Sequence, residues 1–224
     1  MPNRLLLLSL PAMLWASDRF VHPTDVVRAV QQRFQNLKTY SAKFFIEIKE
    51  SQKNKESSGL VYYQKGGKLN FTFHQPPGDV IVSDGKKLYV YVARLRALGI
   101  QDLQLTKEGK NLYETASPDG MMRLFQRYHY RFQNPQQPVT IEGATYYVLE
   151  LKEKVASGSY EKILVYVNPQ SYLIERMVAF SPSGREVRLR FANIELDRDL
   201  PASLFQFQAT EGMRVVENPL ATEG

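Results

Sequence analysis

Hydrophobic positions along the chain follow a helical period first and a period of two afterwards. Between residues 24 and 37 the apolar side chains recur at the i, i+3/i+4, i+7 spacing of a one-sided helix, and Thr24 or Asp25 can cap it. From Tyr40 to Lys49 apolar and polar residues alternate, which is typical of a half-buried strand. The pattern therefore predicts an N-terminal helix that leads into a strand. The apolar positions of this helix are Val26, Val27, Val30, Phe34 and Leu37.

Short alternating segments continue to residue 196, separated by turns rich in Pro and Gly. The Asp84-Gly85 pair lies between two apolar runs and predicts a hairpin with a type I′ turn, which needs a positive φ at both central residues. The further strands are expected at 60–64, 69–74, 79–83, 88–92, 146–152, 162–167, 172–180 and 186–196.

The stretch between residues 93 and 134 follows a different pattern. It is irregular through 108–110 and then predicts a helix from Pro118, with Ser117 as its cap, to about Tyr128. About nine antiparallel strands with two helices predict a mainly β (α+β) fold. We expect a curved antiparallel sheet that forms an unclosed β-barrel, with the helices covering its concave face.

The first 17 residues are typical of a secretory signal peptide. Arg4 precedes an apolar stretch of twelve residues, 5–16, which is too short to span a bilayer. A buried N-terminal helix is the alternative, although Pro11 interrupts it and it has no polar face. We therefore expect a signal peptide over 1–17 and one domain over 18–224, a length that can bury its own core.

Charge and cysteine content narrow the possible functions. The net charge is +6, and Lys and Arg are scattered rather than clustered; with an export signal as well, we expect no nucleic-acid partner. The chain has no cysteine, which excludes thiol catalysis, Cys-bound metals and lipid attachment through a lipobox cysteine.

Candidate catalytic residues do not form a constellation. His22, His74 and His129 lie far apart and have no metal-ligand spacing, and no nucleophile elbow or phosphate-binding loop is present. Asp79 and Asp84 fit turns. No catalytic residue, metal or cofactor is therefore expected, and binding is the remaining class of function.

Large apolar side chains supply one face of every expected strand and of both helices. Periodicity alone leaves two interpretations open, a solid core or an apolar cavity. Adjacent methionines in the 118–128 helix favour a surface that repacks around varied ligands. If the face is a cavity, the side chains expected to line it are Phe34, Phe44, Ile46, Phe71, Phe73, Val82, Val90, Met121, Leu124 and Phe125.

Three ordered segments, 34–44, 71–91 and 203–215, resemble the LolA-like periplasmic outer-membrane lipoprotein carriers. The central segment contains Phe71-Thr72-Phe73, then Pro76-Pro77, then the run from Val82 to Tyr91 that is similar to the family's Val-Ser-Asp-Gly-Lys-x-Leu-aromatic-x-Tyr signature. The resemblance implies a helical lid over a cavity that holds the acyl chains of lipoproteins. It further implies a periplasmic monomer that receives them from an inner-membrane lipoprotein-releasing transporter and delivers them to the outer membrane, to an acceptor where one exists.

The chain departs from the family pattern at two places. Lys65-Gly66 stands where members commonly have Arg-Pro, so Lys65 takes the place of the Arg that latches the lid; we expect it to bind carbonyls of the 93–128 region. The family's Tyr-Asp/Asn-Pro is replaced by Tyr91-Val92-Ala93. An envelope sensor or interaction module on the same fold is the alternative to a carrier, with an enzyme as the third interpretation.

Overall fold

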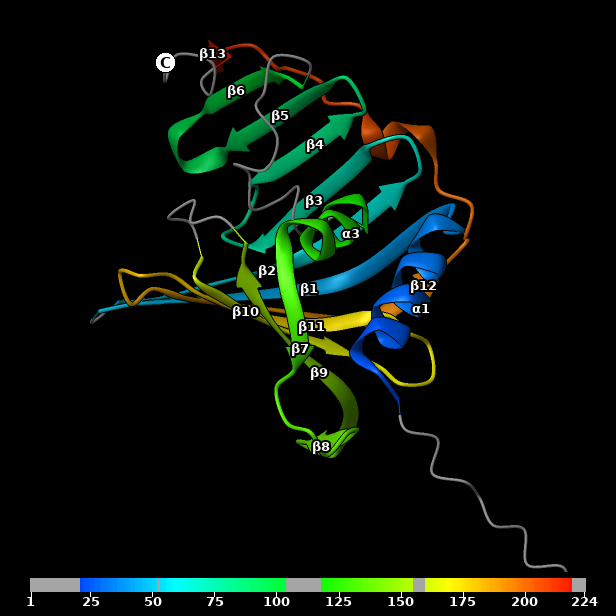
Figure 1. Ribbon diagram of the computed structural model, residues 1–224. Coiled ribbons are helices and arrows are strands. Elements are labelled where there is room, and N and C mark those ends of the chain that lie inside the picture. The colour runs from blue at the N-terminus through cyan, green and yellow to red at the C-terminus, as the bar shows by residue number, and fades with distance from the viewer. Residues whose placement is uncertain (1–20, 52, 104–117, 155–159, 219–224) are drawn as a thin grey trace, which may run out of the picture.

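One strongly curved sheet carries both helices on its concave side (Figure 1). The structure is a computed structural model that describes residues 21–51, 53–103, 118–154 and 160–218. Its thirteen-stranded sheet has the order β13-β6-β5-β4-β3-β2-β1-β12-β11-β10-β9-β7, with β8 paired to β9. The strands are β1 (Thr39–Glu50), β2 (Lys53–Gln64), β3 (Lys68–Gln75), β4 (Val80–Asp84), β5 (Lys87–Val92), β6 (Ala97–Asp102), β7 (Tyr128–Phe132), β8 (Val139–Ile141), β9 (Ala144–Glu153), β10 (Lys162–Val167), β11 (Ile174–Phe180), β12 (Glu186–Leu196) and β13 (Arg214–Glu217).

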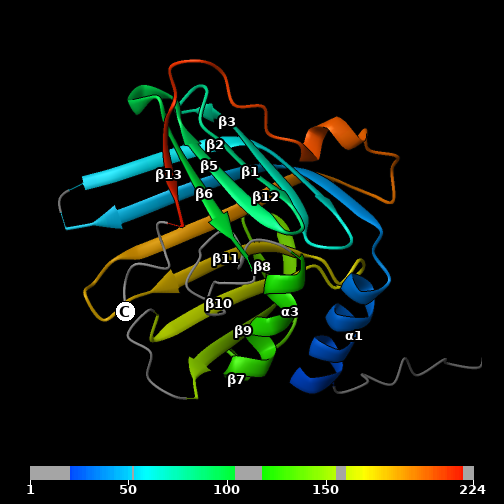
Figure 2. The same ribbon diagram turned by 90° about the horizontal axis from the view of Figure 1, so that it is seen from above.

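The expected fold class is confirmed. β1 is the central strand, pairing with β2 on one side and β12 on the other, and the two halves of the sheet curve toward the same side. The end strands β13 and β7 are not neighbours in the described sheet, so the barrel is unclosed. Seen from above, α1 (Pro23–Gln35) and α3 (Pro118–Arg127) lie side by side across the concave side (Figure 2). We call this concave side the inner face and the opposite side the outer face.

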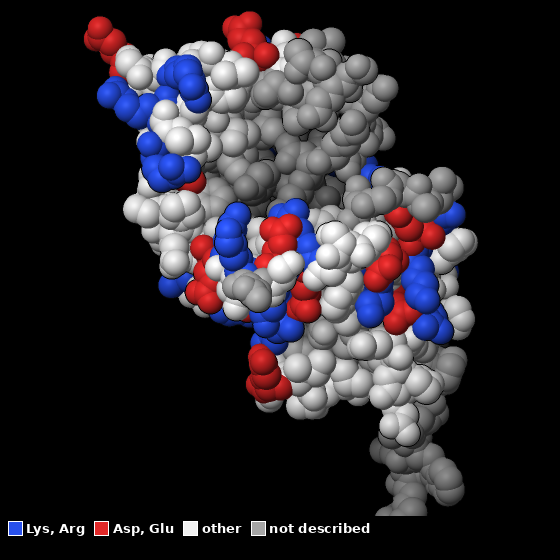
Figure 3. Space-filling view, turned by 90° about the vertical axis from the view of Figure 1, so that its left-hand side faces the viewer, with Lys and Arg blue, Asp and Glu red and all other residues white. Residues whose placement is uncertain are grey.

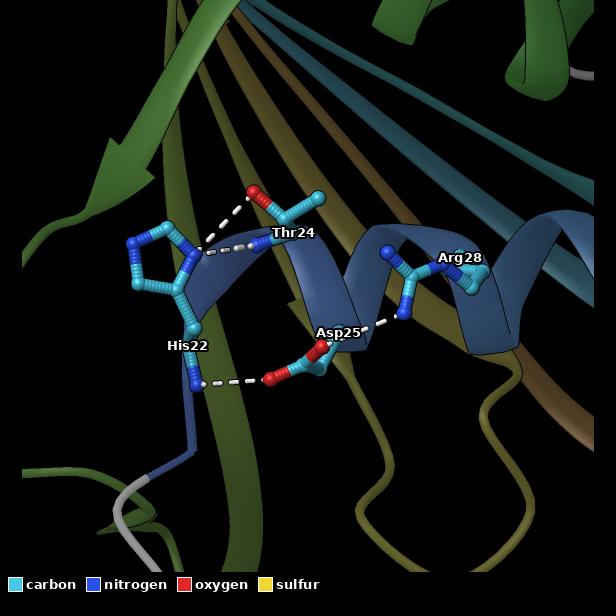
Figure 4. Close-up of polar contacts among 4 residues, drawn as sticks. All are labelled: His22, Thr24, Asp25 and Arg28. Carbon is cyan, nitrogen blue, oxygen red and sulfur yellow. Dashed lines mark hydrogen bonds and ion pairs between the residues drawn. The ribbon is translucent and has the colours of Figure 1, made fainter.

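α1 begins two or three residues earlier than the sequence predicts, because His22 rather than Thr24 or Asp25 is its cap. The His22 Nδ1 atom accepts a hydrogen bond from the Thr24 backbone N–H at 3.3 Å, and the His22 N–H donates to Asp25 at 3.3 Å (Figure 4). Pro23 fits the first helical position since it needs no hydrogen-bond partner there. The expected apolar stripe is confirmed: Val26, Val27, Val30 and Phe34 are buried.

Several strands of the structure are absent from the prediction. β6, β7, β8 and β13 are short, with at most six residues each, and the first half of β2 is polar. The hairpin at Asp84 is confirmed, but its loop is Gly85-Lys86 and only Gly85 has a positive φ, so the type I′ assignment is wrong. Asp84 instead accepts hydrogen bonds from the backbone of Lys86 and Lys87, both at 2.8 Å.

The C-terminal segment crosses the outer face of β3 to β5 before joining the edge of the sheet. The 3-10 turn η2 (Ala202–Phe205) buries Phe205, and Asn70 donates to the Leu204 carbonyl at 2.6 Å. Phe207 then stacks on Tyr89 with ring centroids 5.8 Å apart. β13 finally pairs in parallel with β6. This part of the sheet is therefore covered on both faces. The proposed signal peptide lies outside the described residues.

Candidate functional site

The inner face is built from rows of side chains that pair directly across neighbouring strands. Val61, Phe71, Ile81 and Val90 are successive partners from β2 to β5. Directly paired residues point to the same face of a sheet, so these four form one apolar row. A second row passes through Phe44, Gly59 and Phe73 on β1, β2 and β3.

Three phenylalanine rings meet at the centre of this face. The Phe44 ring centroid lies 5.0 Å from those of Phe71 and Phe73, and both contacts are edge-to-face. Gly59 makes the arrangement possible, because a Cβ there would lie 2.9 Å from the Phe44 ring and 2.0 Å from the Thr72 carbonyl oxygen. The Phe44 ring is consequently held between the backbone at Gly59 and the rings of Phe71 and Phe73.

Both helices pack on the inner face. Met121, Leu124 and Phe125 of α3 are buried and belong to the same hydrophobic cluster as Phe44 and Phe71. The helix follows the prediction, beginning at Pro118, although its N-terminal cap lies outside the described residues. The position of α3 over the inner face is that expected of a lid (Figures 1 and 2).

The structure brings most of the expected site residues together. Phe34, Phe44, Ile46, Phe71, Phe73, Met121, Leu124 and Phe125 lie in one buried cluster, and Val90 packs against it half-buried. The prediction that Val82 lies on the inner face is wrong, because Val82 pairs with Asn70 and Tyr89 and so points to the outer face. Ile81 occupies the inner position. The whole run 80–82 is apolar, so alternation could not identify which face each residue takes.

The prediction that Lys65 latches α3 is wrong as far as the described part of the 93–128 region is concerned. Its Nζ atom donates to the Gln35 carbonyl at 3.0 Å, and its backbone N–H donates to the Lys38 carbonyl at 2.8 Å. Both acceptors lie at or just after the C-terminal end of α1, where the helix has carbonyls without intrahelical partners and a partial negative charge. Lys65 therefore attaches α1, not α3, to the sheet.

The chemistry of this site is apolar. Every member of the cluster is hydrophobic. Burial raises the pKa values of the Tyr40, Tyr128 and Tyr147 hydroxyls, so these tyrosines are neutral. Among the described residues no group of three His, Asp or Glu side chains could hold a metal ion. The cluster can therefore bind apolar surface.

Partly exposed apolar side chains continue the cluster to its margin. Val90, Leu103, Met122 and Tyr160 pack against the buried core while remaining accessible. Acidic and basic side chains are interspersed on the face that Figure 3 shows. Among the described helices, none is long and apolar enough to cross a membrane.

Comparison with known proteins agrees with this geometry. The family profile described as "Outer membrane lipoprotein carrier protein LolA" matches residues 35–208. The outer-membrane lipoprotein carrier protein of Legionella pneumophila (strain Lens) is 25% identical over 218 residues, which cover 96% of this chain and 99% of that protein. Its namesake from Methylococcus capsulatus is 26% identical over 222 residues, which cover 97% of this chain and 100% of that protein.

A solved structure shares the fold. The crystal structure of an uncharacterized conserved protein from Thermus thermophilus superimposes with a TM-score of 0.57 at 12% sequence identity, covering 87% of this chain and 98% of that one. At this level of identity the likeness concerns the curved sheet and its helices alone.

Proposed function

The chain belongs to the outer membrane lipoprotein carrier protein LolA family, and from this premise we propose that it carries lipoproteins from the inner to the outer membrane by holding their acyl chains on the inner face. Members of this periplasmic family are binding chaperones, so the chain is a carrier and not an enzyme. An inner-membrane lipoprotein-releasing transporter and an outer-membrane acceptor are the partners that this proposal requires.

The observation that carries the proposal is the apolar cluster shared by the inner face and α3. Phe44, Phe71 and Phe73 contact one another ring to ring and lie in the same buried cluster as Met121, Leu124 and Phe125 of α3. The hydrocarbon tail of an acyl chain has no polar group to satisfy, so a continuous apolar surface is the chemistry that its binding requires.

A lid that covers the same surface gives the carrier a way to release its cargo. Burial of apolar area is worth roughly 25 cal/mol per Å², both for the side chains of α3 and for an acyl chain. The two therefore compete for the inner face, and the carrier needs no energy-coupling motif of its own. A membrane or acceptor that binds the acyl chains more strongly shifts the equilibrium toward the closed lid.

The mobility that this exchange requires is favoured by how α3 is attached. Among the described elements it packs chiefly against α1 and β7, the strand into which it continues directly. A helix fixed at its C-terminal end and held elsewhere by apolar side chains can swing away without breaking sheet hydrogen bonds. Lys65 does not oppose such a movement, since it binds α1.

The experiment that tests the function is purification of the exported protein from the periplasm, followed by mass spectrometry of what accompanies it. We expect triacylated or diacylated lipoproteins in stoichiometric amount. Recovery of free phospholipid alone would indicate a lipid carrier instead. A protein partner without acyl chains would favour an envelope sensor or interaction module and contradict the proposal.

A further inference from the structure

A groove lies on the outer face, on the opposite side of the sheet from α3. It has a volume of about 860 Å³ and crosses strands β10, β11, β12, β1 and β2. Its floor includes Phe45, Leu164, Tyr166, Val178 and Phe180. This volume falls within the range of roughly 300–1,000 Å³ that ligand sites of proteins commonly have.

Two arginines stand directly opposite each other at one side of this groove. Arg176 of β11 and Arg190 of β12 are cross-strand partners. Like charges in such a position repel and destabilise a sheet unless an anion lies between them. Arg190 is half-buried and makes no ion pair with any described carboxylate; its guanidinium carbon lies 4.0 Å from the centre of the Phe45 ring. Phe45 is the one residue that breaks the polar pattern of its strand.

The anion that approaches these arginines comes from a hairpin tip. The Glu142 carboxylate accepts a hydrogen bond from Arg176 at 2.7 Å, although the Glu142 side chain is 71% exposed. The hydrogen bond and charge of Arg176, together with the charges of Arg190 and Arg188, lower the pKa of Glu142. Glu142 is therefore ionised and lies close enough to Arg176, Arg188 and Arg190 for their charges to act on it.

The backbone at Glu142 is unfavourable for a glutamate. Glu142 and Gly143 form the two-residue loop between β8 and β9, and their φ angles are 52° and 81°. Positive φ at both positions defines a type I′ turn, in which Asn or Asp is strongly preferred before Gly. A glutamate at this position lowers the stability of the turn. Its longer side chain is therefore expected to make a contact that an Asn or Asp side chain could not.

We propose that Arg176 and Arg190 form a binding site for the carboxylate of a medium- or long-chain fatty acid whose alkyl chain lies along the apolar floor of the outer groove, and that Glu142 occupies this site as an internal competitor. A carboxylate fits because a carboxylate already binds there. Glu47 and Glu56, which are paired across β1 and β2, also line the groove. Because these carboxylates repel an anion, an anionic headgroup is favoured beside Arg176 and Arg190.

Arg188 does not add to the site directly. It is bound to Glu186 and lies 3.9 Å from Glu47. The positive charge available to a ligand is therefore that of Arg190, joined by that of Arg176 when Glu142 moves away. The arginine site is separate from the proposed carrier surface, because Arg176 and Arg190 lie on the opposite face of the sheet from α3.

The test follows [1-13C]laurate bound to the full exported chain by NMR, below the micelle concentration. Wild type should give a bound carboxyl signal that Arg190→Gln weakens by about tenfold in affinity, as expected for loss of a charge-assisted hydrogen bond. Glu142→Asn should strengthen it severalfold, since it removes the competitor and keeps the preferred turn residue. Arg190→Lys should retain part of the affinity.

Controls separate this site from others. Arg198→Gln removes an exposed arginine that pairs with Glu195 outside the groove and should change nothing. Dodecyl maltoside, which lacks a charge, and butyrate, which lacks a long chain, should not respond to Arg190→Gln. An unchanged laurate signal in Arg190→Gln that is folded by circular dichroism, or weaker binding in Glu142→Asn, would overturn the proposal. Lipoprotein co-purification should be normal in both variants, so failure here leaves the carrier function standing.

Discussion

The ring of Phe44 occupies the space that a side chain at Gly59, its cross-strand partner, would need. The same missing side chain lets β3 approach, with the Thr72 carbonyl oxygen 2.0 Å from where a Cβ would lie. The position of the three central rings on the inner face therefore depends on one glycine.

Gly59→Ala should lower the free energy of unfolding by about 1–3 kcal/mol, the usual cost of overpacking a core. The backbone of β3 cannot give way as a flexible side chain could. Chemical denaturation measures the change, with Ser57→Ala on the same strand as the control. Equal stability of both variants would mean that the Phe44 and Gly59 contact is not tight.

At Tyr40, unlike at Gly59, we expect a substitution that does not destabilise the protein. Its hydroxyl is buried and has no hydrogen-bond partner among the described residues, and its pKa is raised by burial and by the charge of Glu175. Removing an unpaired buried polar group relieves its desolvation cost, so Tyr40→Phe should leave stability unchanged or raise it by about 1 kcal/mol. A marked loss of stability in thermal unfolding would show that the hydroxyl has a partner.

The lid makes a prediction that a structural helix does not. Leu124→Ala or Phe125→Ala should weaken the packing of α3 on the inner face, raise affinity for acyl chains and slow their release to acceptor membranes. Gln126→Ala, an exposed position on the same helix, is the matched control. Affinity and release are measured with a fluorescent diacylated lipopeptide and liposomes. Weakened or unchanged affinity in folded variants would contradict a competing lid.

Lys65 separates attachment of α1 from control of the lid. Lys65→Gln removes the hydrogen bond to Gln35 and should cost at most about 1 kcal/mol, since the side chain is exposed. Lipopeptide release should keep the wild-type rate. A changed release rate with unchanged stability would contradict this assignment and indicate that Lys65 controls the lid.

Alternation predicts the inner face well because that face is buried along most of its length. β1 and β12 each bury alternate residues, and the helix that carries Leu124 begins where Pro118 indicates. The period fails where both faces are covered. Val82 is buried on the outer face, where η2 packs on its strand, and no local pattern distinguishes it from Ile81.

Long-range features could not be predicted from local signals. The destination of the Lys65 side chain depends on where α1 ends relative to β2, and the C-terminal segment reaches β6 only after crossing three strands. The outer groove is a product of register, which places Arg176 beside Arg190 and brings a hairpin tip against them. Only Phe45 on a polar face and the Glu142-Gly143 pair could have pointed to it.

The central claim is that lipoprotein acyl chains bind on the inner face, and photocrosslinking in living cells tests it most directly. A photoreactive phenylalanine derivative is placed at Phe73 on the inner face, or at Tyr62, which pairs with Asn70 and so points outward. The account predicts lipoprotein adducts, with the crosslink on the acyl chain by mass spectrometry, from position 73 and none from position 62. Adducts from position 62 alone, or no acyl adduct from position 73 in folded, expressed protein, would contradict it.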